Sequence, residues 1–258
     1  MQFSVRFFGT SSASPSVNRG FACIGLLKKN DSAGEDITLM DCGDGSIRRI
    51  IETRTSPLSI SNILITHHHS DHLSGLTQVI ETMSIQGRTK DLGVYGPPGL
   101  KEYFSTIQKT TNVASNRRFA LNILELNKAE KVSFGEYKVT PFSMRHTIPC
   151  LGYRVEHSDF CVAYTGDTEP CENIFPLARN ADLLIHEATY LERERDKARK
   201  TKHSTPREAA EMATQAGAMA LVLTHIDDKH ESEKEMLEET AQIYPKTKIA
   251  HDGFEVNL

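Results

Sequence analysis

The chain of 258 residues is 38% hydrophobic and 25% charged, and its formal net charge is −4. This composition is ordinary for a globular protein with a sizeable core. The acidic balance argues against a generally basic nucleic-acid binder, though not against a local basic groove. No apolar run reaches membrane-spanning length, and the first residues begin a strand instead of a signal peptide.

The five cysteines are odd in number and lack CxxC spacing. This usage indicates reduced thiols, and neither a disulfide framework nor a cysteine–zinc site. We therefore expect a cytoplasmic protein.

Short apolar runs at the N-terminus predict an antiparallel sheet. Residues 5–9, 21–27 and 37–40 have strand patterns, and the segment 41–45, Asp-Cys-Gly-Asp-Gly, ends the last of them. A helical stripe is expected to follow, made of Ile47, Ile50 and Ile51.

The most informative stretch is residues 66–72, Thr-His-His-His-Ser-Asp-His. It follows the apolar run 63–65, which predicts a buried strand, and precedes apolar residues at helical spacing. A strand-to-helix turn thus presents imidazole and carboxylate groups, which suit zinc, manganese or iron better than calcium or magnesium. We exclude His68, whose middle position points away from the others. The expected metal ligands are His67, His69, Asp71 and His72.

This H-x-H-x-D-H pattern resembles the metallo-β-lactamase superfamily, which implies a fold with two metals at one edge of a β-sandwich. We expect Asp41 to be a buried carboxylate that accepts a ring N–H from a ligand histidine and so fixes its tautomer. The alternative is an ordinary turn aspartate.

Further candidate ligands stand at strand ends in the second half of the chain. His146 follows the predicted strand 137–144, and Asp167 follows Gly166 after the predicted strand 160–164. His225 follows the strand 221–224. An aspartate released from a strand by a glycine is well placed to bridge two metals.

Two capping boxes mark helices near the C-terminus. Residues 205–208, Thr-Pro-Arg-Glu, predict a helix that carries small alanines and stops at Gly217, and residues 232–235 predict a last helix ended by Pro245. His203 lies just before the first of these helices, where backbone N–H groups favour a phosphate. With strand-rich halves each followed by helices and no interdomain linker, residues 1–258 suit a single α/β (α+β) domain, a four-layer αββα sandwich.

The candidate ligands divide into two sets. His67, His69 and His146 would hold one metal, and Asp71, His72 and His225 the other, with Asp167 bridging. A water or hydroxide between metals about 3.5–4 Å apart would be acidified, and the pair would clamp a phosphoryl group. Asp71 would orient that nucleophile or accept its proton. We expect two zinc ions, with manganese as the alternative.

Several motifs together resemble ribonuclease Z along nearly the whole chain. They are residues 8–10, 41–45, 152–154, 166–168, 186–189, 203–205 and 223–225. The resemblance implies cleavage of tRNA precursors at the 3′ end, hydrolysis of simple phosphodiesters and a homodimer. It also implies that His203 protonates the leaving group or steadies the phosphate and that Glu187 positions His203. A histidine is matched to such proton transfer at neutral pH.

One departure from that family is visible. Bacterial ribonuclease Z usually carries a long flexible arm that grips the tRNA body after the Gly-Tyr-Arg segment. Here only residues 155–164 separate Arg154 from Thr165, enough for a tight hairpin. Basic residues left for RNA binding are Arg48, Arg49, Arg193, Arg195, Lys197, Arg199, Lys200 and Lys202.

The leading interpretation is a dinuclear metal phosphodiesterase acting on RNA 3′ ends. The nearest alternative hydrolyses a small or cyclic phosphodiester. A thioester or β-lactam hydrolase uses the same metal loop without needing the segments 186–189 and 203–205, and di-iron chemistry favours a carboxylate where His69 stands. A non-enzymatic scaffold should have lost ligands, and none is missing.

Overall fold

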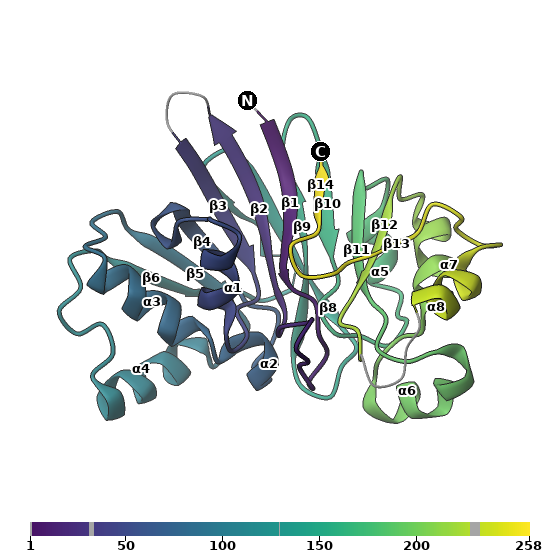
Figure 1. Cartoon of the computed structure of the whole chain (residues 1–258), viewed down its shortest axis with the longest axis horizontal. Coiled ribbons are helices and arrows are strands. Elements are labelled where there is room, and N and C mark those ends of the chain that lie inside the picture. Colours follow the sequence, from purple (N-terminus) through teal and green to yellow (C-terminus); the bar gives the residue numbers. More distant parts are fainter. Residues whose placement is uncertain (1, 31–33, 129, 228–232) are drawn as a thin grey trace. The chain divides into compact units, whose positions relative to one another are not determined.

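A computed structural model of the protein describes residues 2–30, 34–128, 130–227 and 233–258. Its contacts divide the chain into two compact units. Unit 1 consists of Met1–Thr10, Val17–Leu126 and Asp252–Leu258, and unit 2 consists of Ser11–Ser16 and Asn127–His251. Each unit is built on one seven-stranded sheet (Figure 1).

The sheet of unit 1 is mixed, in the order β14-β1-β2-β3-β4-β5-β6. Its antiparallel part confirms the predicted opening and consists of β14 (Glu255–Asn257), β1 (Gln2–Gly9), β2 (Cys23–Asn30) and β3 (Gly34–Met40). Its parallel part continues from β3 through β4 (Ile60–Leu64), β5 (Leu92–Gly96) and β6 (Leu121–Glu125). Parallel strands present their carboxyl ends at one edge, which is where the loop after β4 emerges.

The helices of unit 1 bury apolar stripes against this sheet. They are α1 (Ser46–Glu52), α2 (Ser70–Leu73), α3 (Leu76–Ile85) and α4 (Leu100–Thr111), with the 3₁₀ turn η1 (Pro57–Ser59). In α3, Leu76, Val79, Ile80 and Met83 recur at helical spacing and are fully buried in the core. Such burial contributes about 1.5–3 kcal/mol per side chain. The stripe predicted for α1 is wrong at one position, because Ile51 is 52% exposed while the adjacent Ile50 is buried.

The sheet of unit 2 is also mixed, in the order β13-β12-β11-β10-β9-β8-β7. Antiparallel pairs join β7 (Val132–Phe134), β8 (Tyr137–Met144), β9 (Cys150–Glu156) and β10 (Cys161–Tyr164). Parallel pairs join β10, β11 (Leu183–Glu187), β12 (Leu221–Thr224) and β13 (Lys248–Ile249).

The predicted tight hairpin is present between β9 and β10. The His157 N–H donates to the Phe160 carbonyl at 2.9 Å, and the two rings stack with centroids 5.0 Å apart. An aromatic pair therefore closes this turn.

The helices of unit 2 are α5 (Ile174–Ala178), α6 (Arg195–Thr201), α7 (Pro206–Ala216) and α8 (Glu233–Thr240), with the 3₁₀ turn η2 (Glu192–Glu194). The predicted capping box of α7 forms between Thr205 and Glu208, and Gly217 ends the helix at φ 68°. Ser232 lies outside the described residues. The helix α8 ends at Thr240, before the predicted stop at Pro245.

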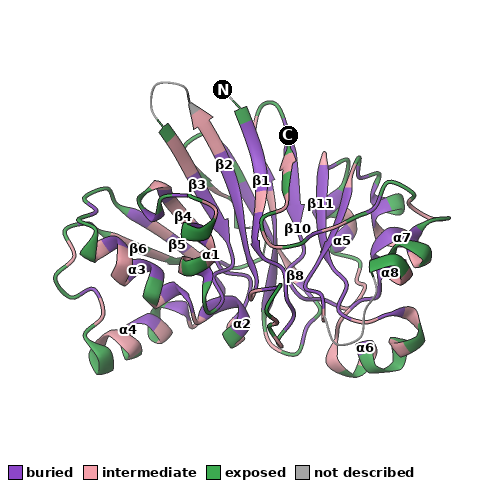
Figure 2. Cartoon of the chain, in the orientation of Figure 1, coloured by how far each residue is buried: buried purple, intermediate pink, exposed green. Residues whose placement is uncertain are grey.

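Exposed residues gather on helices such as α6 and α8, while the strands are largely buried (Figure 2). None of the helices in the described ranges combines the length and the apolar character that crossing a membrane requires.

Candidate metal centre

The first cluster of polar side chains lies in unit 1, on the loop from β4 into α2. His67 and His72 are fully buried and Asp71 nearly so. The loop packs so closely on its neighbours that a Cβ at Gly43 would lie 2.1 Å from the Asp71 carbonyl oxygen. Glycine in the Asp-Cys-Gly-Asp-Gly segment is therefore what lets this loop settle against the end of β3.

Asp41 fixes the orientation of this loop. One carboxylate oxygen accepts the Thr66 N–H at 2.8 Å, and the other lies 2.7 Å from Nδ1 of His72. The hydroxyl of Thr66 donates to the Asp41 carboxylate at 3.0 Å and lies 2.9 Å from Nδ1 of His67. Both ring nitrogens therefore carry their protons toward fixed acceptors, which leaves the Nε2 lone pairs for a ligand. Asp41 itself is fully buried.

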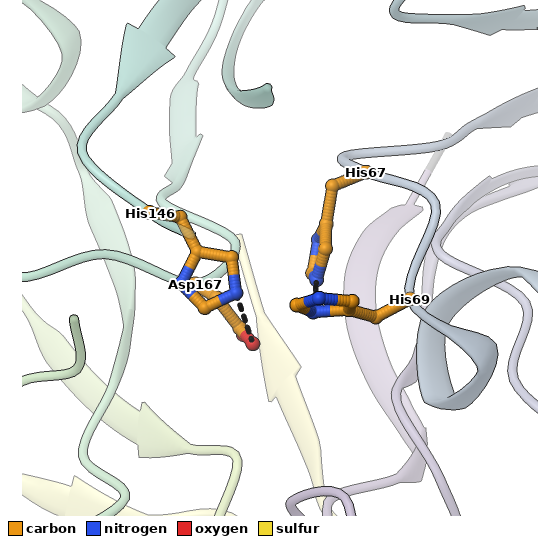
Figure 3. Close-up of side chains that lie close together, drawn as sticks. All are labelled: His67, His69, His146 and Asp167. Carbon is orange, nitrogen blue, oxygen red and sulfur yellow. Dashed lines mark hydrogen bonds and ion pairs between the residues drawn. The ribbon is translucent and has the colours of Figure 1, made fainter. Parts of the chain in front are cut away.

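Those Nε2 atoms face other candidate ligands of the same loop. Nε2 of His67 lies 3.0 Å from Nδ1 of His69 (Figure 3), and Nε2 of His72 lies 3.5 Å from an Asp71 carboxylate oxygen. His68 takes another direction, with its ring next to the Gly99 backbone, and burial lowers its pKa despite nearby Glu125. Its exclusion from the ligand set agrees with this placement.

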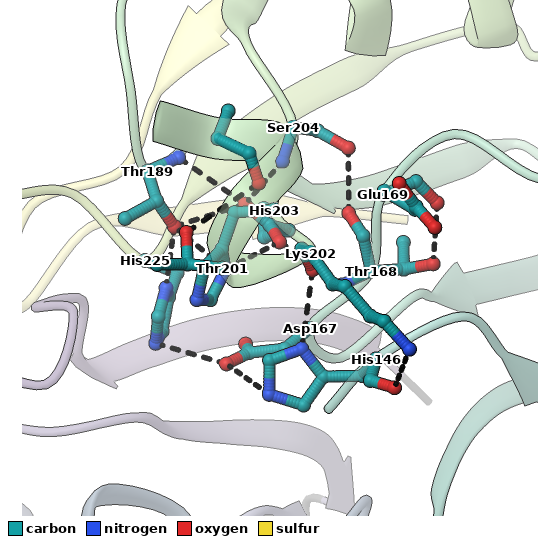
Figure 4. Close-up of polar contacts among 12 residues, drawn as sticks. His146, Asp167, Thr168, Glu169, Thr189, Thr201, Lys202, His203, Ser204 and His225 are labelled. Atoms are coloured by element: carbon teal, nitrogen blue, oxygen red, sulfur yellow. Dashed lines mark hydrogen bonds and ion pairs between the residues drawn. The ribbon is translucent and has the colours of Figure 1, made fainter. Parts of the chain in front are cut away.

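The second cluster lies in unit 2, at the ends of β8, β10 and β12. The Asp167 carboxylate follows Gly166, whose φ of 59° turns the chain out of β10. It lies 3.8 Å from Nε2 of His146 (Figure 3) and 3.4 Å from Nε2 of His225 (Figure 4). Asp167 thus stands between the two histidines, as a bridging carboxylate would.

Outer partners again hold the Nδ1 atoms of these histidines. Nδ1 of His225 lies 2.8 Å from the Thr189 hydroxyl, and Nδ1 of His146 lies 3.1 Å from the Lys202 carbonyl oxygen. Burial lowers the pKa of His146, although Asp167 and the Lys202 carbonyl oppose that shift. The Nε2 atom of His146 faces the Asp167 carboxylate, and this placement suits a metal ligand.

Glu187 and His203 form a hydrogen-bonded pair beside the second cluster. Nδ1 of His203 lies 2.7 Å from Glu187, which is fully buried and also accepts from the Thr168, Thr189 and Ser204 N–H groups. Burial alone would raise the pKa of Glu187. Attraction to His203 and their hydrogen bond outweigh it and lower the pKa below its ordinary value. The His203 ring stacks on that of His225, with centroids 5.4 Å apart.

Three supporting residues were not predicted. Thr66 and Thr189 lay in conspicuous motifs, where a hydroxyl next to a candidate ligand or carboxylate was the available signal. Lys202 was expected only as part of a basic run, and its contact with His146 follows from a backbone conformation that the sequence does not display.

The donor sets within each unit fit a divalent metal ion. In unit 1 they are imidazoles and a carboxylate with oriented Nε2 atoms, and in unit 2 the ligand atom of Asp167 lies within 4.8 Å of those of His146 and of His225. Imidazole with carboxylate is the chemistry of zinc, manganese and iron sites.

Comparison with known proteins gives a consistent result. Residues 38–226 match the sequence model of the β-lactamase superfamily domain. A ribonuclease Z of Methanothermobacter thermautotrophicus is 32% identical over 302 residues, covering 98% of this chain and 96% of that protein. A ribonuclease Z of Gemmatimonas aurantiaca is 33% identical over 312 residues, covering 100% and 96%. Both alignments are longer than the 258 residues of this chain, so these relatives carry segments that it lacks.

Solved structures agree on the fold. The short form of human tRNase Z superposes with a TM-score of 0.83 at 26% identity, covering 98% of both chains. The metallo-β-lactamase fold protein YhfI of Bacillus subtilis superposes with a TM-score of 0.85 at 22% identity, covering 100% of both chains.

Proposed function

Because this chain belongs to the ribonuclease Z family of the β-lactamase superfamily, and is therefore a metal-dependent phosphodiester hydrolase, we propose that it cuts tRNA precursors at their 3′ ends with two bound metal ions. The observation that carries the proposal is the common arrangement of four histidines. His67, His72, His146 and His225 each have Nδ1 within hydrogen-bonding distance of an outer oxygen and Nε2 directed at another candidate ligand.

The proposed ligand sets are those expected from the sequence. His67, His69 and His146 hold one ion, Asp71, His72 and His225 hold the other, and Asp167 is shared. We propose zinc as the native metal, with manganese as the alternative. Bound ions of this kind would acidify a water and neutralise charge on the phosphoryl oxygens.

The protein's own groups supply orientation and protons. Asp71 orients the attacking water or accepts its proton. His203 holds its Nδ1 proton against Glu187, so that Nε2 in the imidazolium form can protonate the departing oxygen. The Glu187 carboxylate stabilises that imidazolium and, because it also accepts backbone N–H groups, stays fixed while the proton moves.

The size of the substrate that the protein can bind depends on its cationic surface as well as on the chemistry of the metal site. Ion pairs within the protein already engage most of the basic residues expected to bind RNA, among them Arg195 and Arg199 with Glu208, Arg193 with Glu235 and Arg48 with Glu52. Without the arm, few contacts to the phosphates of tRNA are left. We therefore expect tRNA binding to be weak and salt-sensitive unless a homodimer partner adds contacts.

A small or cyclic phosphodiester is the second candidate substrate. The closed turn between β9 and β10 favours it, since hydrolysis of a small diester needs no arm. The five free cysteines, four of them buried, are compatible with the cytoplasmic location that we propose.

A side-by-side assay distinguishes these possibilities. Zinc-loaded protein is given an activated phosphodiester, a cyclic nucleotide and a tRNA precursor, each at low and at physiological salt. We expect turnover of the activated diester at both, and precursor cleavage that falls steeply with salt. Efficient, salt-tolerant precursor cleavage would show that the arm is dispensable. Inactivity on every phosphodiester would overturn the proposed function.

A further inference from the structure

Lys202 occupies a backbone position that favours glycine. It ends α6 in the left-handed region, at φ 56°, and its N–H and that of His203 cap the helix through the Arg199 and Ala198 carbonyls. A helix that ends in this way usually has glycine there, because any side chain adds strain. A lysine at this position therefore calls for a compensating contact.

Lys202 makes two such contacts, and both are with His146. The Lys202 carbonyl oxygen lies 3.1 Å from Nδ1 of His146, and the Lys202 ammonium donates to the His146 carbonyl at 3.1 Å (Figure 4). The left-handed turn aims the carbonyl and the side chain at the same partner. Glycine could supply the first contact but not the second.

The second contact acts on a short loop. His146 lies between β8, which ends at Met144, and β9, which begins at Cys150. On its N-terminal side the loop is held by the backbone bridge of Arg145 with Glu169 and by the Thr168 hydroxyl, which accepts the Arg145 N–H at 3.1 Å. The Lys202 ammonium holds the peptide unit on the other side of the imidazole.

We propose that Lys202 is a positioning residue that clamps His146 in the orientation needed to bind metal. The inference rests on the proposed function in taking His146 as a metal ligand. Through its carbonyl Lys202 fixes the ring tautomer, and through its ammonium it fixes the backbone that carries the ring. Because His203 is the next residue, the same short segment sets the placement of a metal ligand and of the proton donor.

Three substitutions separate this role from general stabilisation. Lys202→Met and Lys202→Gly both remove the ammonium, but glycine also relieves the left-handed strain. Lys202→Arg keeps a cationic donor. We expect zinc affinity, measured by competition with a chromogenic chelator, to fall about 10–100-fold in the Met and Gly variants, as for other outer-sphere partners of metal ligands. The Arg variant should retain most of it.

Further measurements complete the test. The metal-free Lys202→Gly protein should unfold at a temperature equal to or above that of wild type, so that lost zinc affinity cannot be ascribed to a damaged fold. With an activated phosphodiester at limiting zinc, kcat should fall and KM should not change. Lys234→Met, which removes an exposed lysine of α8, is the charge-matched control and should behave as wild type.

Two results overturn the inference alone: unchanged zinc affinity in both Lys202→Met and Lys202→Gly, or a raised KM with unchanged affinity, which would make Lys202 a substrate contact. A wild-type protein that binds no zinc and cleaves no phosphodiester would instead overturn the proposed function.

Discussion

Asp41 holds His72 from a strained backbone: at φ 62° the carboxylate lies 2.7 Å from Nδ1 of the histidine. His225 and Lys202 also have positive φ, at 59° and 56°. Non-glycine residues in this region store strain of about 1–3 kcal/mol each and cluster at functional sites. The same conformation occurs outside the polar clusters, at Arg54, Asn112, Ala114 and Asn180, so Asp41, Lys202 and His225 are distinguished by their contacts and not by the positive φ alone.

Replacement of Asp41 by asparagine should weaken metal binding while the fold persists. The amide keeps the size of the side chain, but it cannot hold the His72 N–H with a charged acceptor. We expect about a 10–100-fold loss of zinc affinity, measured by chelator competition. Asp44→Asn, in the exposed part of the same segment, is the control. If the two variants bound zinc with equal affinity, Asp41 would be an ordinary turn residue that does not support metal binding.

Replacement of Asp167 by alanine should remove more metal than loss of a ligand to one ion. As the proposed bridge it serves both ions, so elemental analysis should fall from about two metal ions per chain in wild type to below one. Asp159→Ala, at an exposed turn, should retain the wild-type content. Fully active wild-type protein without transition metal would refute the site.

Replacement of His203 by alanine should separate chemistry from metal binding. A positioned general acid contributes about 10²–10⁴-fold to kcat, and metal content should stay near wild type. His251→Ala, an exposed histidine of the same unit, should leave kcat unchanged. Near-normal turnover in His203→Ala would show that His203 is only a surface histidine beside a helix. Loss of metal from the variant would show that His203 is a metal ligand.

Glu255 provides a pH test remote from these clusters. Partial burial by itself would raise the pKa of Glu255, but hydrogen bonds from Ser4 and Arg6 lower it below its ordinary value. A carboxyl with a lowered folded-state pKa stabilises the protein above its unfolded-state pKa and loses that contribution as pH falls through the folded-state pKa.

Urea unfolding of wild type and Glu255→Gln should therefore differ by about 1–2 kcal/mol at pH 7, since the bonds involve charge but are partly exposed. The difference should shrink once pH falls below about 4.3. A difference that persists unchanged at pH 3 would mean that charge is not the cause.

The sequence predicted the elements well where local chemistry decides them. The capping box at Thr205, the strand before His67 and the β9–β10 hairpin all follow from short-range patterns, and all are present. Membership of the metallo-β-lactamase fold confirms the predicted fold class. The prediction for Ile51 was wrong because a helical stripe tolerates only certain angular positions, and the residue after Ile50 lies about 100° around the helix.

The sequence predicted the members of the polar clusters but not the contacts that support them. Motif spacing predicted candidate ligands at strand ends, because each strand delivers its last residue to a sheet edge. Thr189 contacts His225 across 36 positions of the chain, and Lys202 contacts His146 across 56. Such contacts depend on register and on left-handed turns, which side-chain patterns do not encode.

The stacked pair of His157 and Phe160 makes the β9–β10 turn a natural acceptor for grafting. The strands on either side are already paired, from Cys161 opposite Glu156 to Tyr164 opposite Tyr153, so an inserted segment starts and finishes at neighbouring points. The entropic penalty for a longer loop grows only slowly, by about 0.6 kcal/mol for each doubling of length. A segment inserted between these two rings would therefore test whether substrate range depends on the length of this turn.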